Sequence, residues 1–229
     1  ILYILYVGAW HTKFVRFMLP FLPFLILSAS WFLFKIKGRS QTLGRFLISF
    51  FCIATFLWAL SFFSIYTKEQ TRITASLWIY QHIPVESKLL GEHWDDGLPV
   101  SLNSLSPGLY DIDQLTIYES DNNEKIKYYA EKLSEAEYII INSRRLYGTL
   151  MYLPAKYPIT SRYYELLFAG SLGYEKVAEF TSYPSLFGII INDDASEETF
   201  QVYDHPKVMI FKNNKRLSEE QLEVTLTVQ

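Results

Sequence analysis

The first 66 residues contain no aspartate or glutamate, and the 229-residue chain has a single cysteine, Cys52. The first part carries six lysine and arginine residues, whereas the remaining 163 residues carry 15 basic and 24 acidic side chains. One cysteine cannot form a disulfide within the chain. The acidic second part argues against nucleic acid as a partner. Because the two parts differ so much in charge, we expect separate domains at 1–66 and 67–229.

The sequence also lacks the common motifs of nucleotide and redox sites. It has no Gly-x-Gly-x-x-Gly, no phosphate-binding Walker loop and no Cys-x-x-Cys. A nucleotide-binding Rossmann domain is therefore not expected. No internal repeat and no coiled-coil heptad runs through the chain, so no repeat architecture is expected either.

Two apolar runs of 21 residues each dominate the first part. Residues 14–34 contain one charge, Arg16, near one end, and residues 46–66 contain none. About 20 apolar helical residues cross the roughly 30 Å hydrocarbon core of a bilayer. We therefore predict two membrane-spanning helices; the alternative is a helical hairpin in the core of a soluble protein. Residues 1–9 are also apolar, and because the chain begins at Ile1, we interpret them as the end of a truncated span in a longer membrane protein.

The distribution of basic residues predicts the orientation of these spans. The connection 35–45 carries four basic and no acidic residues. Cytoplasmic loops are enriched in lysine and arginine, so we expect this loop in the cytoplasm and the residues after Tyr66 on the outer side. The predicted fold class is thus a membrane α-helical region followed by a small extracytoplasmic α/β domain.

Lys13 and Arg16 stand three residues apart at the start of the first complete span, which places them on one face of a helix. Basic residues at span ends commonly extend to lipid headgroups. The alternative is that the two side chains bind the phosphate of a lipid-linked substrate. Membrane lipids are expected partners under either interpretation.

The second part shows a pattern in which helices alternate with short apolar strands. Buried strands read as continuous apolar runs, such as Tyr138–Asn142. The helices are predicted over 71–82, 123–133, 160–169 and 197–203 and from Ser218 onward, and the strands over 87–91, 138–142, 174–180, 186–191 and 208–212. This alternation predicts a small α/β domain with a partly parallel sheet.

The densest polar cluster, Glu92-His93-Trp94-Asp95-Asp96, follows the first predicted strand. Functional loops of α/β folds usually lie at such strand ends. Three carboxylates and an imidazole can bind a divalent metal, orient a sugar hydroxyl or transfer protons, and Trp94 can stack on the apolar face of a sugar. The alternative is a solvated turn in which Asp95 and Asp96 cap backbone amides. No second ligand cluster accompanies these residues, so metal binding stays an open alternative and no metal site is assigned.

Two further polar groups lie next to predicted strands. Arg144 and Arg145 follow the strand at 138–142 and can clamp a phosphate or a carboxylate through paired hydrogen bonds, although surface arginines are the commoner case. Asp204-His205-Pro206 precedes the last strand. It fits either a proton-relay pair or, as we favour, a turn that Asp204 caps.

Several segments of the chain carry a family resemblance. His11–Phe24 reads His-Thr-Lys-Phe-Val-Arg-Phe-Met-Leu-Pro-Phe-Leu-Pro-Phe, and Glu92–Pro99 reads Glu-His-Trp-Asp-Asp-Gly-Leu-Pro. Together with residues 75–80, 83–84, 143–147, 163–168 and 204–206, these segments resemble the family-39-like glycosyltransferases of the GT-C superfamily. Members of that family are multi-span membrane enzymes that use polyprenyl-phosphate-linked sugars.

The resemblance implies sugar transfer on the extracytoplasmic side by an inverting single displacement. A base activates the acceptor and the lipid phosphate leaves. The key acidic residue of such enzymes lies in the first extracytoplasmic loop, which we expect to precede this chain, so no residue here is assigned as the base. The resemblance also implies that Lys13 and Arg16 face the lipid phosphate, where cations stabilise the departing charge.

The residues of the 92–96 cluster, together with Arg144 and Arg145, are then expected to face the substrate. The expected partners are a polyprenyl-phosphate-linked sugar and an unknown glycan, lipid or protein acceptor, and no cofactor is assigned. The competing hypothesis is a non-catalytic, membrane-anchored α/β domain that binds a glycan or a protein partner.

Overall fold

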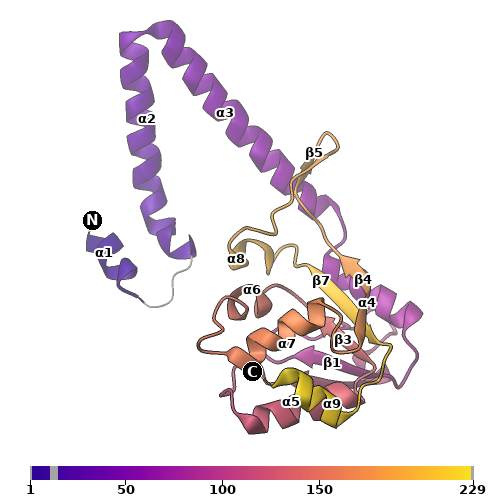
Figure 1. Cartoon of the computed structure of the whole chain (residues 1–229). Helices are drawn as coiled ribbons and strands as arrows, with labels where there is room; N and C mark the ends of the chain where they lie inside the picture. Colours follow the sequence, from indigo (N-terminus) through magenta and orange to yellow (C-terminus); the bar gives the residue numbers. More distant parts are fainter. Residues whose placement is uncertain (1, 11–14, 228–229) are drawn as a thin grey trace. The chain divides into compact units, whose positions relative to one another are not determined.

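The structure, a computed structural model, describes residues 2–10 and 15–227. The chain forms two compact units (Figure 1). The first unit comprises Ile1–Thr67 and Tyr183–Phe200, and the second comprises Lys68–Ser182 and Gln201–Gln229. Segment 183–200, which lies inside the range 67–229 of the predicted second domain, is thus part of the first unit.

The first unit contains two long helices that are joined by a single residue. Its helices are α1 (Leu2–Gly8), the 3₁₀ helix η1 (Val15–Phe21), α2 (Leu22–Arg39), α3 (Gln41–Phe63) and the 3₁₀ helix η2 (Ser64–Thr67). Ser40 separates α2 from α3, and its Oγ accepts the backbone N–H of Leu43 at 3.5 Å, which caps α3. The expected loop over 35–45 is therefore wrong, because both helices continue into this range and carry its basic residues.

Close packing beside this turn depends on Gly44. A Cβ atom added to Gly44 would lie 2.2 Å from the Cα atom of Lys37, so the backbones of α2 and α3 are in contact here. A Cβ atom added to Gly38 would meet no other atom of the described residues within 4 Å. The packing of the helices therefore requires glycine at position 44 but not at position 38.

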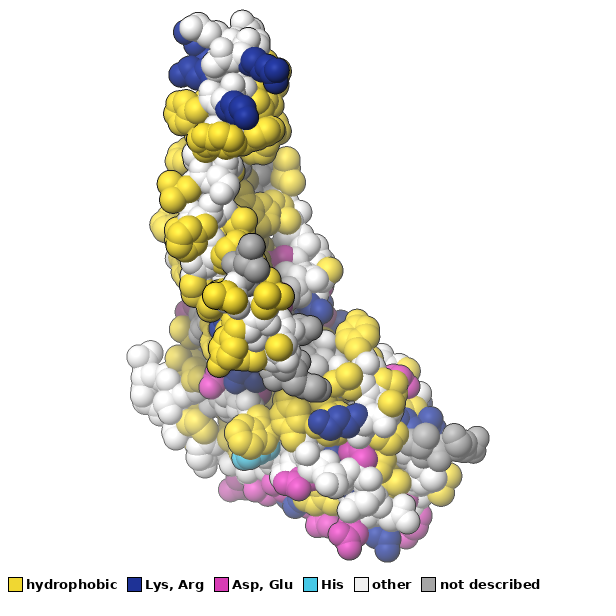
Figure 2. All heavy atoms as spheres, turned by 90° about the vertical axis from the view of Figure 1, so that its left-hand side faces the viewer, with side chains coloured by type: hydrophobic (Ala, Val, Ile, Leu, Met, Phe, Trp, Pro, Cys, Tyr) yellow, Lys and Arg dark blue, Asp and Glu magenta, His cyan; other side chains and the backbone are white. Residues whose placement is uncertain are grey.

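The side chains of α2 and α3 are mostly apolar and face outward. Two helical segments, Val15–Arg39 and Gln41–His82, are long and apolar enough to cross a membrane, and only 0% and 6% of their most apolar stretches are buried. Figure 2 shows hydrophobic side chains along the helical hairpin and basic side chains at its end. A surface helix of a globular domain buries one apolar stripe, which these two helices do not do within their unit.

Segment 183–200 contains a small hairpin in place of the single strand expected over 186–191. Strand β5 (Ser185–Leu186) pairs in antiparallel fashion with β6 (Ile189–Ile190). Phe187 and Gly188 have φ angles of 50° and 82°, so they reverse the chain between the two strands. The expected continuous strand is wrong because this two-residue turn interrupts it. Helix α8 (Glu198–Gln201) follows.

The second unit is built on a five-stranded mixed sheet. In spatial order its strands are β2 (Asp111–Leu115), β1 (Lys88–Glu92), β3 (Tyr138–Ile141), β7 (Val208–Asn213) and β4 (Tyr174–Phe180). β1 runs parallel to β2 and β3, whereas β7 runs antiparallel to β3 and β4. The predicted α/β domain with a partly parallel sheet is confirmed. The sequence pattern does not reveal β2, because this edge strand is mostly polar.

Helices cover both faces of this sheet. One face is covered by α5 (Asn123–Glu135), α7 (Pro158–Phe168) and α9 (Glu219–Leu226), and the other by α4 (Thr71–His82). Alternate residues of a strand point to opposite faces. Leu90 and Ile139 accordingly join the core beneath α5 and α7, whereas Leu89 and Ile140 join the core beneath α4. The one-turn helix α6 (Tyr147–Leu150) and the 3₁₀ helix η3 (Pro107–Leu109) belong to the connections.

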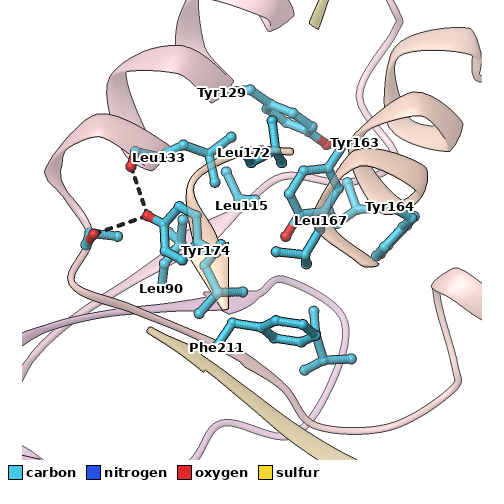
Figure 3. Packing of buried hydrophobic residues seen from close by; sticks show 14 of the residues in the cluster. Leu90, Leu115, Tyr129, Leu133, Tyr163, Tyr164, Leu167, Leu172, Tyr174 and Phe211 are labelled. Atoms are coloured by element: carbon cyan, nitrogen blue, oxygen red, sulfur yellow. Dashed lines mark hydrogen bonds between the residues drawn. The ribbon is translucent and has the colours of Figure 1, made fainter. Parts of the chain in front are cut away.

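Tyrosines form much of the core beneath α5 and α7 (Figure 3). Four of them are fully buried: Tyr129, Tyr163, Tyr164 and Tyr174. Tyr174 Oη donates hydrogen bonds to the carbonyl oxygens of Leu133 at 2.7 Å and Ala136 at 2.9 Å. Buried tyrosine hydroxyls usually have such a partner. At these positions the tyrosine-rich composition reflects core packing.

A buried ion pair joins α5 to the start of α7. Lys125 Nζ donates hydrogen bonds to Asp121 Oδ1 at 2.6 Å and to Thr160 Oγ1 at 2.8 Å, and both charged side chains are almost inaccessible. The Oδ2 atom of Asp121 accepts the backbone N–H of Ile159 at 2.7 Å and so caps α7. Burial of these two charges is tolerated because each is paired and hydrogen-bonded.

Candidate functional site

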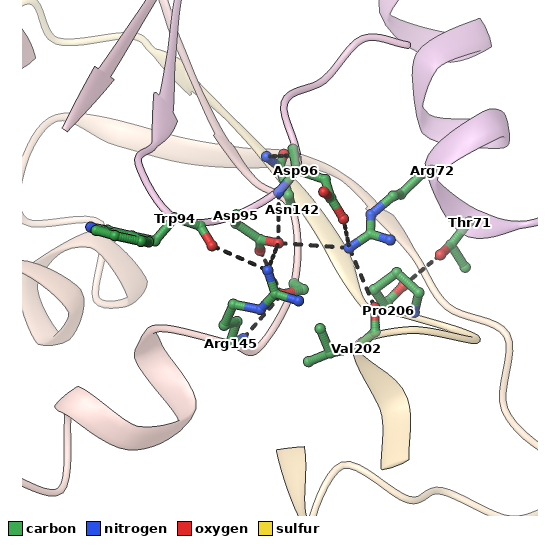
Figure 4. A network of polar contacts seen from close by, with 10 residues as sticks. Thr71, Arg72, Trp94, Asp95, Asp96, Asn142, Arg145, Val202 and Pro206 are labelled. Carbon is green, nitrogen blue, oxygen red and sulfur yellow. Dashed lines mark hydrogen bonds and ion pairs between the residues drawn. The ribbon is translucent and has the colours of Figure 1, made fainter. Parts of the chain in front are cut away.

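The carboxyl ends of β1 and β3 lie next to each other, because the two strands are parallel neighbours. The chain leaves β1 for β2 on one side and returns through α5 to β3 on the other side. This reversal is a topological switch point, where open α/β sheets usually bind their ligands. Loop 93–98 follows β1 and segment 142–146 follows β3, and side chains from the two segments form the polar network drawn in Figure 4.

Asp95 is the centre of this network. Its side chain is completely buried, and its Oδ2 atom accepts a hydrogen bond from Ser143 Oγ at 2.5 Å. Its Oδ1 atom lies 3.6 Å from Nη2 of Arg72 and 3.7 Å from Nη1 of Arg145. A buried carboxylate is stable only with such compensation. Asp95 therefore links loop 93–98 to two other elements instead of facing solvent, as the substrate-facing assignment required.

Arg72 reaches the network from the first turn of α4 and is the main residue that the sequence reasoning missed. It is buried, and its Nη2 atom lies 3.1 Å from Oδ2 of Asp96 and donates to the carbonyl oxygen of Val202 at 3.3 Å. In the sequence it looks like an ordinary basic residue of an amphipathic helix. The signal available was its position within the first turn of a helix that directly precedes β1.

The two neighbouring arginines, Arg144 and Arg145, have different roles. Arg145 Nη1 donates to the carbonyl oxygen of Trp94 at 3.1 Å, and its guanidinium lies 5.5 Å from the ring centroid of Tyr203. The side chain of Arg144 packs close to Gly148, where an added Cβ atom would lie 2.6 Å from Arg144 Cγ. Arg145 therefore holds loop 93–98, whereas the side chain of Arg144 lies against the one-turn helix α6.

Trp94 and His93 are the parts of the cluster that face solvent. Trp94 is 64% exposed with a φ angle of 82°, and its ring stands edge-on to the ring of His93 at 5.1 Å. Figure 4 shows the Trp94 side chain directed away from the polar network. The Asp96 side chain is also 65% exposed, while its carbonyl oxygen accepts a hydrogen bond from Asn142 Nδ2. A fixed backbone thus presents an aromatic ring, an imidazole and a carboxylate outward.

The Glu92 side chain, at the end of β1, points into the core beneath α5 and α7. Its assignment as a substrate-facing residue therefore does not fit the structure. The side chain is 1% exposed, and its Oε1 atom accepts a hydrogen bond from Tyr164 Oη at 2.6 Å. Burial raises the pKa of Glu92 to about 8, with a smaller contribution from nearby Asp95, while the Tyr164 hydrogen bond opposes the shift. The carboxyl group is therefore mostly protonated at neutral pH.

The predicted lipid-phosphate pair, Lys13 and Arg16, is described only in part. Lys13 lies outside the described residues. Arg16 lies in η1 with an exposed side chain, and its guanidinium is 5.7 Å from the ring centroid of Phe17. An exposed cation at the start of an apolar helix can contact a headgroup or a substrate phosphate, so both interpretations stay open.

The described residues contain no group of three or more His, Cys, Asp or Glu side chains that could hold a metal ion. Successive side chains of a strand point to opposite faces, so Glu92 points into the core while His93 points outward. The two side chains therefore cannot bind one metal ion together. Asp204-His205-Pro206 lies in a turn, as favoured from the sequence, and the Pro206 carbonyl oxygen accepts a hydrogen bond from Thr71 Oγ1 at 2.6 Å.

Comparison of the chain with protein-family models, with curated proteins and with solved structures finds no match. The resemblance to the GT-C superfamily therefore stays a prediction from the sequence.

Proposed function

We propose that this chain is part of an integral-membrane glycosyltransferase. In this proposal α2 and α3 span the membrane, and the α/β unit lies on the extracytoplasmic side. There it contacts a sugar that is transferred from a lipid-phosphate carrier to an acceptor. Loop 93–98 supplies the sugar contact, and the base that activates the acceptor comes from outside this chain.

The observation that carries the proposal is the exposed Trp94 on a loop that is fixed by charged groups at a topological switch point. An indole ring offers an apolar surface to the axial C–H groups of a sugar ring, and it has few rotatable bonds to immobilise. His93 stands beside it, and Asp96 follows two residues later in the same loop; both can hydrogen-bond to a ligand. Arg72 and Arg145 compensate the buried Asp95 and hold the loop in place, which reduces the entropy lost on binding.

The membrane part of the proposal rests on the composition of α2 and α3. Both helices are apolar and have mostly exposed side chains, and Lys37 and Arg39 lie in the last turn of α2. Basic residues at the junction of α2 and α3 favour a cytoplasmic location for this junction. The opposite ends of the two helices then lie on the outer side. A lipid-linked donor lies in the same bilayer, so a membrane anchor keeps the sugar-binding unit near its substrate.

A non-catalytic glycan-binding domain is the second candidate, and one observation favours it. The carboxylates of the cluster are engaged: Asp95 is buried between arginines, Asp96 pairs with Arg72, and Glu92 is in the core. Binding of a glycan through Trp94 requires none of them as a base. The two candidates share the sugar-binding surface and differ in whether sugar transfer takes place.

The decisive experiment measures sugar transfer by the membrane protein that contains this chain, reconstituted in vesicles with polyprenyl-phosphate hexoses and pentoses. Trp94→Ala is expected to lower kcat/KM by about tenfold, which corresponds to about 1.4 kcal/mol of lost transition-state stabilisation. Trp94→Phe is expected to retain most activity. Tyr152→Ala removes another exposed aromatic ring of the unit and serves as the matched control.

The same assay tests the predicted lipid-phosphate residues. Lys13→Ala and Arg16→Ala are expected to lower transfer by about tenfold or more while expression persists. Full activity of both variants would remove their phosphate role. Absence of transfer with every donor, together with retained glycan binding that needs Trp94, would favour the non-catalytic domain.

A further inference from the structure

The tip of the β5–β6 hairpin is apolar and exposed. The seven residues Ser185–Ile191 carry no charge. Phe187 is 87% exposed, and Ile189 and Ile190 are 69% and 68% exposed. Three large apolar side chains at one protruding turn are unusual on a water-facing surface, where the solvation cost has no compensation.

The backbone conformation of Phe187 is unfavourable as well. Phe187 and Gly188 form the two-residue connection between β5 and β6, and both have positive φ angles. Hairpin turns of this kind favour Asn-Gly or Asp-Gly, because asparagine and aspartate tolerate the left-handed region better than bulky residues do. A phenylalanine here is both strained and exposed, which points to a role for its side chain outside the folded chain.

The hairpin is attached to the end of α3, within the same unit. Ser64, the residue after α3, accepts the backbone N–H of Ser185 on its Oγ at 2.9 Å. The ring of Phe62 in the last turn of α3 lies 5.1 Å from that of Phe200, at the other end of segment 183–200. Figure 1 shows the hairpin projecting beside the last turns of α3.

The β5–β6 hairpin is polar at its base and apolar at its tip, as a segment that enters a membrane surface tip first would be. Its base is polar: Tyr183 Oη donates to Asp194 Oδ2 at 3.0 Å, and Asp193 and Asp194 follow the second strand. The exposed Tyr66, in η2 directly after α3, is of the residue type that lies at the level of lipid headgroups. Strand β5, which leads to the apolar tip, contacts α3.

We infer that the tip of the β5–β6 hairpin inserts Phe187, Ile189 and Ile190 into the lipid interface beside the end of α3. This inference rests on the membrane location of α3 in the proposed function. Insertion is shallow, because a two-stranded hairpin leaves backbone N–H and C=O groups that need water or headgroups as partners. Three side chains alone bind lipid weakly, but α3 already keeps the hairpin at the bilayer and supplies a high effective concentration.

The single cysteine of the chain makes a direct test practical. Cys52 on α3 is exposed, and a fluorophore on it reports whether α3 lies in lipid. In a Cys52→Ala background, Phe187→Cys and Ile189→Cys carry the same environment-sensitive fluorophore at the tip, and the second variant keeps the Phe187 ring. Val224→Cys, at a 77% exposed position of α9, is the matched control. The full chain is reconstituted in phosphatidylcholine vesicles with nitroxide quenchers at shallow or deep acyl positions.

We expect both tip labels to show blue-shifted emission and to be quenched at least about twofold more by the shallow than by the deep nitroxide. The Val224 label is expected to resist quenching. Water-like, unquenched tip labels together with a quenched Cys52 label would overturn the hairpin inference and leave the membrane location of α3 intact. An unquenched Cys52 label would overturn both. Concentration-dependent shielding of the tip without nitroxide quenching would assign the surface to a second copy of the chain and overturn lipid insertion.

Discussion

The hydroxyl group of Tyr164 donates a hydrogen bond of 2.6 Å to Oε1 of Glu92 inside the core of the α/β unit. Within the described residues no donor reaches the other carboxyl oxygen, Oε2. A carboxyl group in this position is favoured in its neutral form, since ionisation would leave a buried charge with one hydrogen bond. Glu92 therefore behaves as a buried titratable group directly beneath the loop that carries Trp94.

The stability of the α/β unit should fall as pH rises from about 4.5 to about 8. In this window folded Glu92 holds a proton that the unfolded chain has released, because its pKa is raised from 4.5 to about 8 in the folded state. The loss amounts to roughly 3 kcal/mol by pH 7. Above pH 8 both states are ionised and this contribution stays constant. Glu92→Gln should remove the dependence and be more stable than the wild type at pH 8, as measured by chemical unfolding in detergent micelles.

The matched control for this prediction is Glu131→Gln, which removes an exposed carboxylate on α5. It should leave the pH profile unchanged. Tyr164→Phe removes the donor to Glu92 and should extend the decline in stability to higher pH. A pH profile of Glu92→Gln that is identical to the wild-type profile would contradict the buried, neutral carboxyl group.

Arg72 and Asp95 should be energetically coupled. Arg72→Met leaves the buried Asp95 with fewer compensating charges, whereas Asp95→Asn removes the charge itself. A double-mutant cycle on the free energy of unfolding should therefore give a coupling of about 1–3 kcal/mol. Lys88 and Glu135, an exposed pair at 2.7 Å in the same unit, provide the control cycle and should show coupling close to zero. A coupling close to zero between Arg72 and Asp95 would show that Arg72 does not support the loop.

Lys125→Met should destabilise the α/β unit by about 3–5 kcal/mol, because it leaves Asp121 buried without its partner. The substitution also removes the donor to the carbonyl oxygens of Ile117 and Glu119, each at 2.8 Å. Lys127→Met, on the exposed side of the same helix, should change stability by less than about 0.5 kcal/mol. Denaturant unfolding of both variants checks this, and equal stabilities would refute the structural role of the pair.

Gly44→Ala should weaken the α2–α3 hairpin, because its Cβ atom would overlap the backbone of Lys37. Gly38→Ala has open space within the described part of the chain and should be neutral or stabilising by up to about 1 kcal/mol, since alanine favours the helix. Thermal unfolding followed by circular dichroism in one detergent compares the two. A less stable Gly38→Ala together with an unaffected Gly44→Ala would reverse the predicted order.

The sequence was sufficient for the composition-driven features of the fold. Charge and apolar run length separate the long helices from the α/β part, and the continuous run at 138–141 identifies the central strand β3. The features that it did not predict depend on weak local signals. The edge strand β2 has a polar sequence, and the junction of α2 and α3 contains glycines that suggest a loop although Ser40 alone makes the turn.

The position at which strand β1 ends decides which side chains of the 92–96 cluster face the core and which face solvent. The predicted strand 87–91 left Glu92 in the loop, whereas β1 extends to Glu92, so that Glu92 points into the core and His93 points outward. Arg72 contacts Asp95 across 23 positions of sequence, and no local pattern predicts a contact that depends on how α4 packs on the sheet. Trp94 was predicted as a sugar contact, and its exposure is consistent with that role.

Photo-crosslinking with a polyprenyl-phosphate sugar that carries a diazirine on its sugar ring tests the central claim most directly. The membrane protein that contains this chain is labelled in lipid nanodiscs, and the modified peptides are identified by mass spectrometry. The proposed function predicts crosslinks in loop 93–98 and at Arg145, and a marked loss of these crosslinks in Trp94→Ala but not in Tyr152→Ala. Crosslinks that avoid loop 93–98, or that persist unchanged in Trp94→Ala, would contradict it.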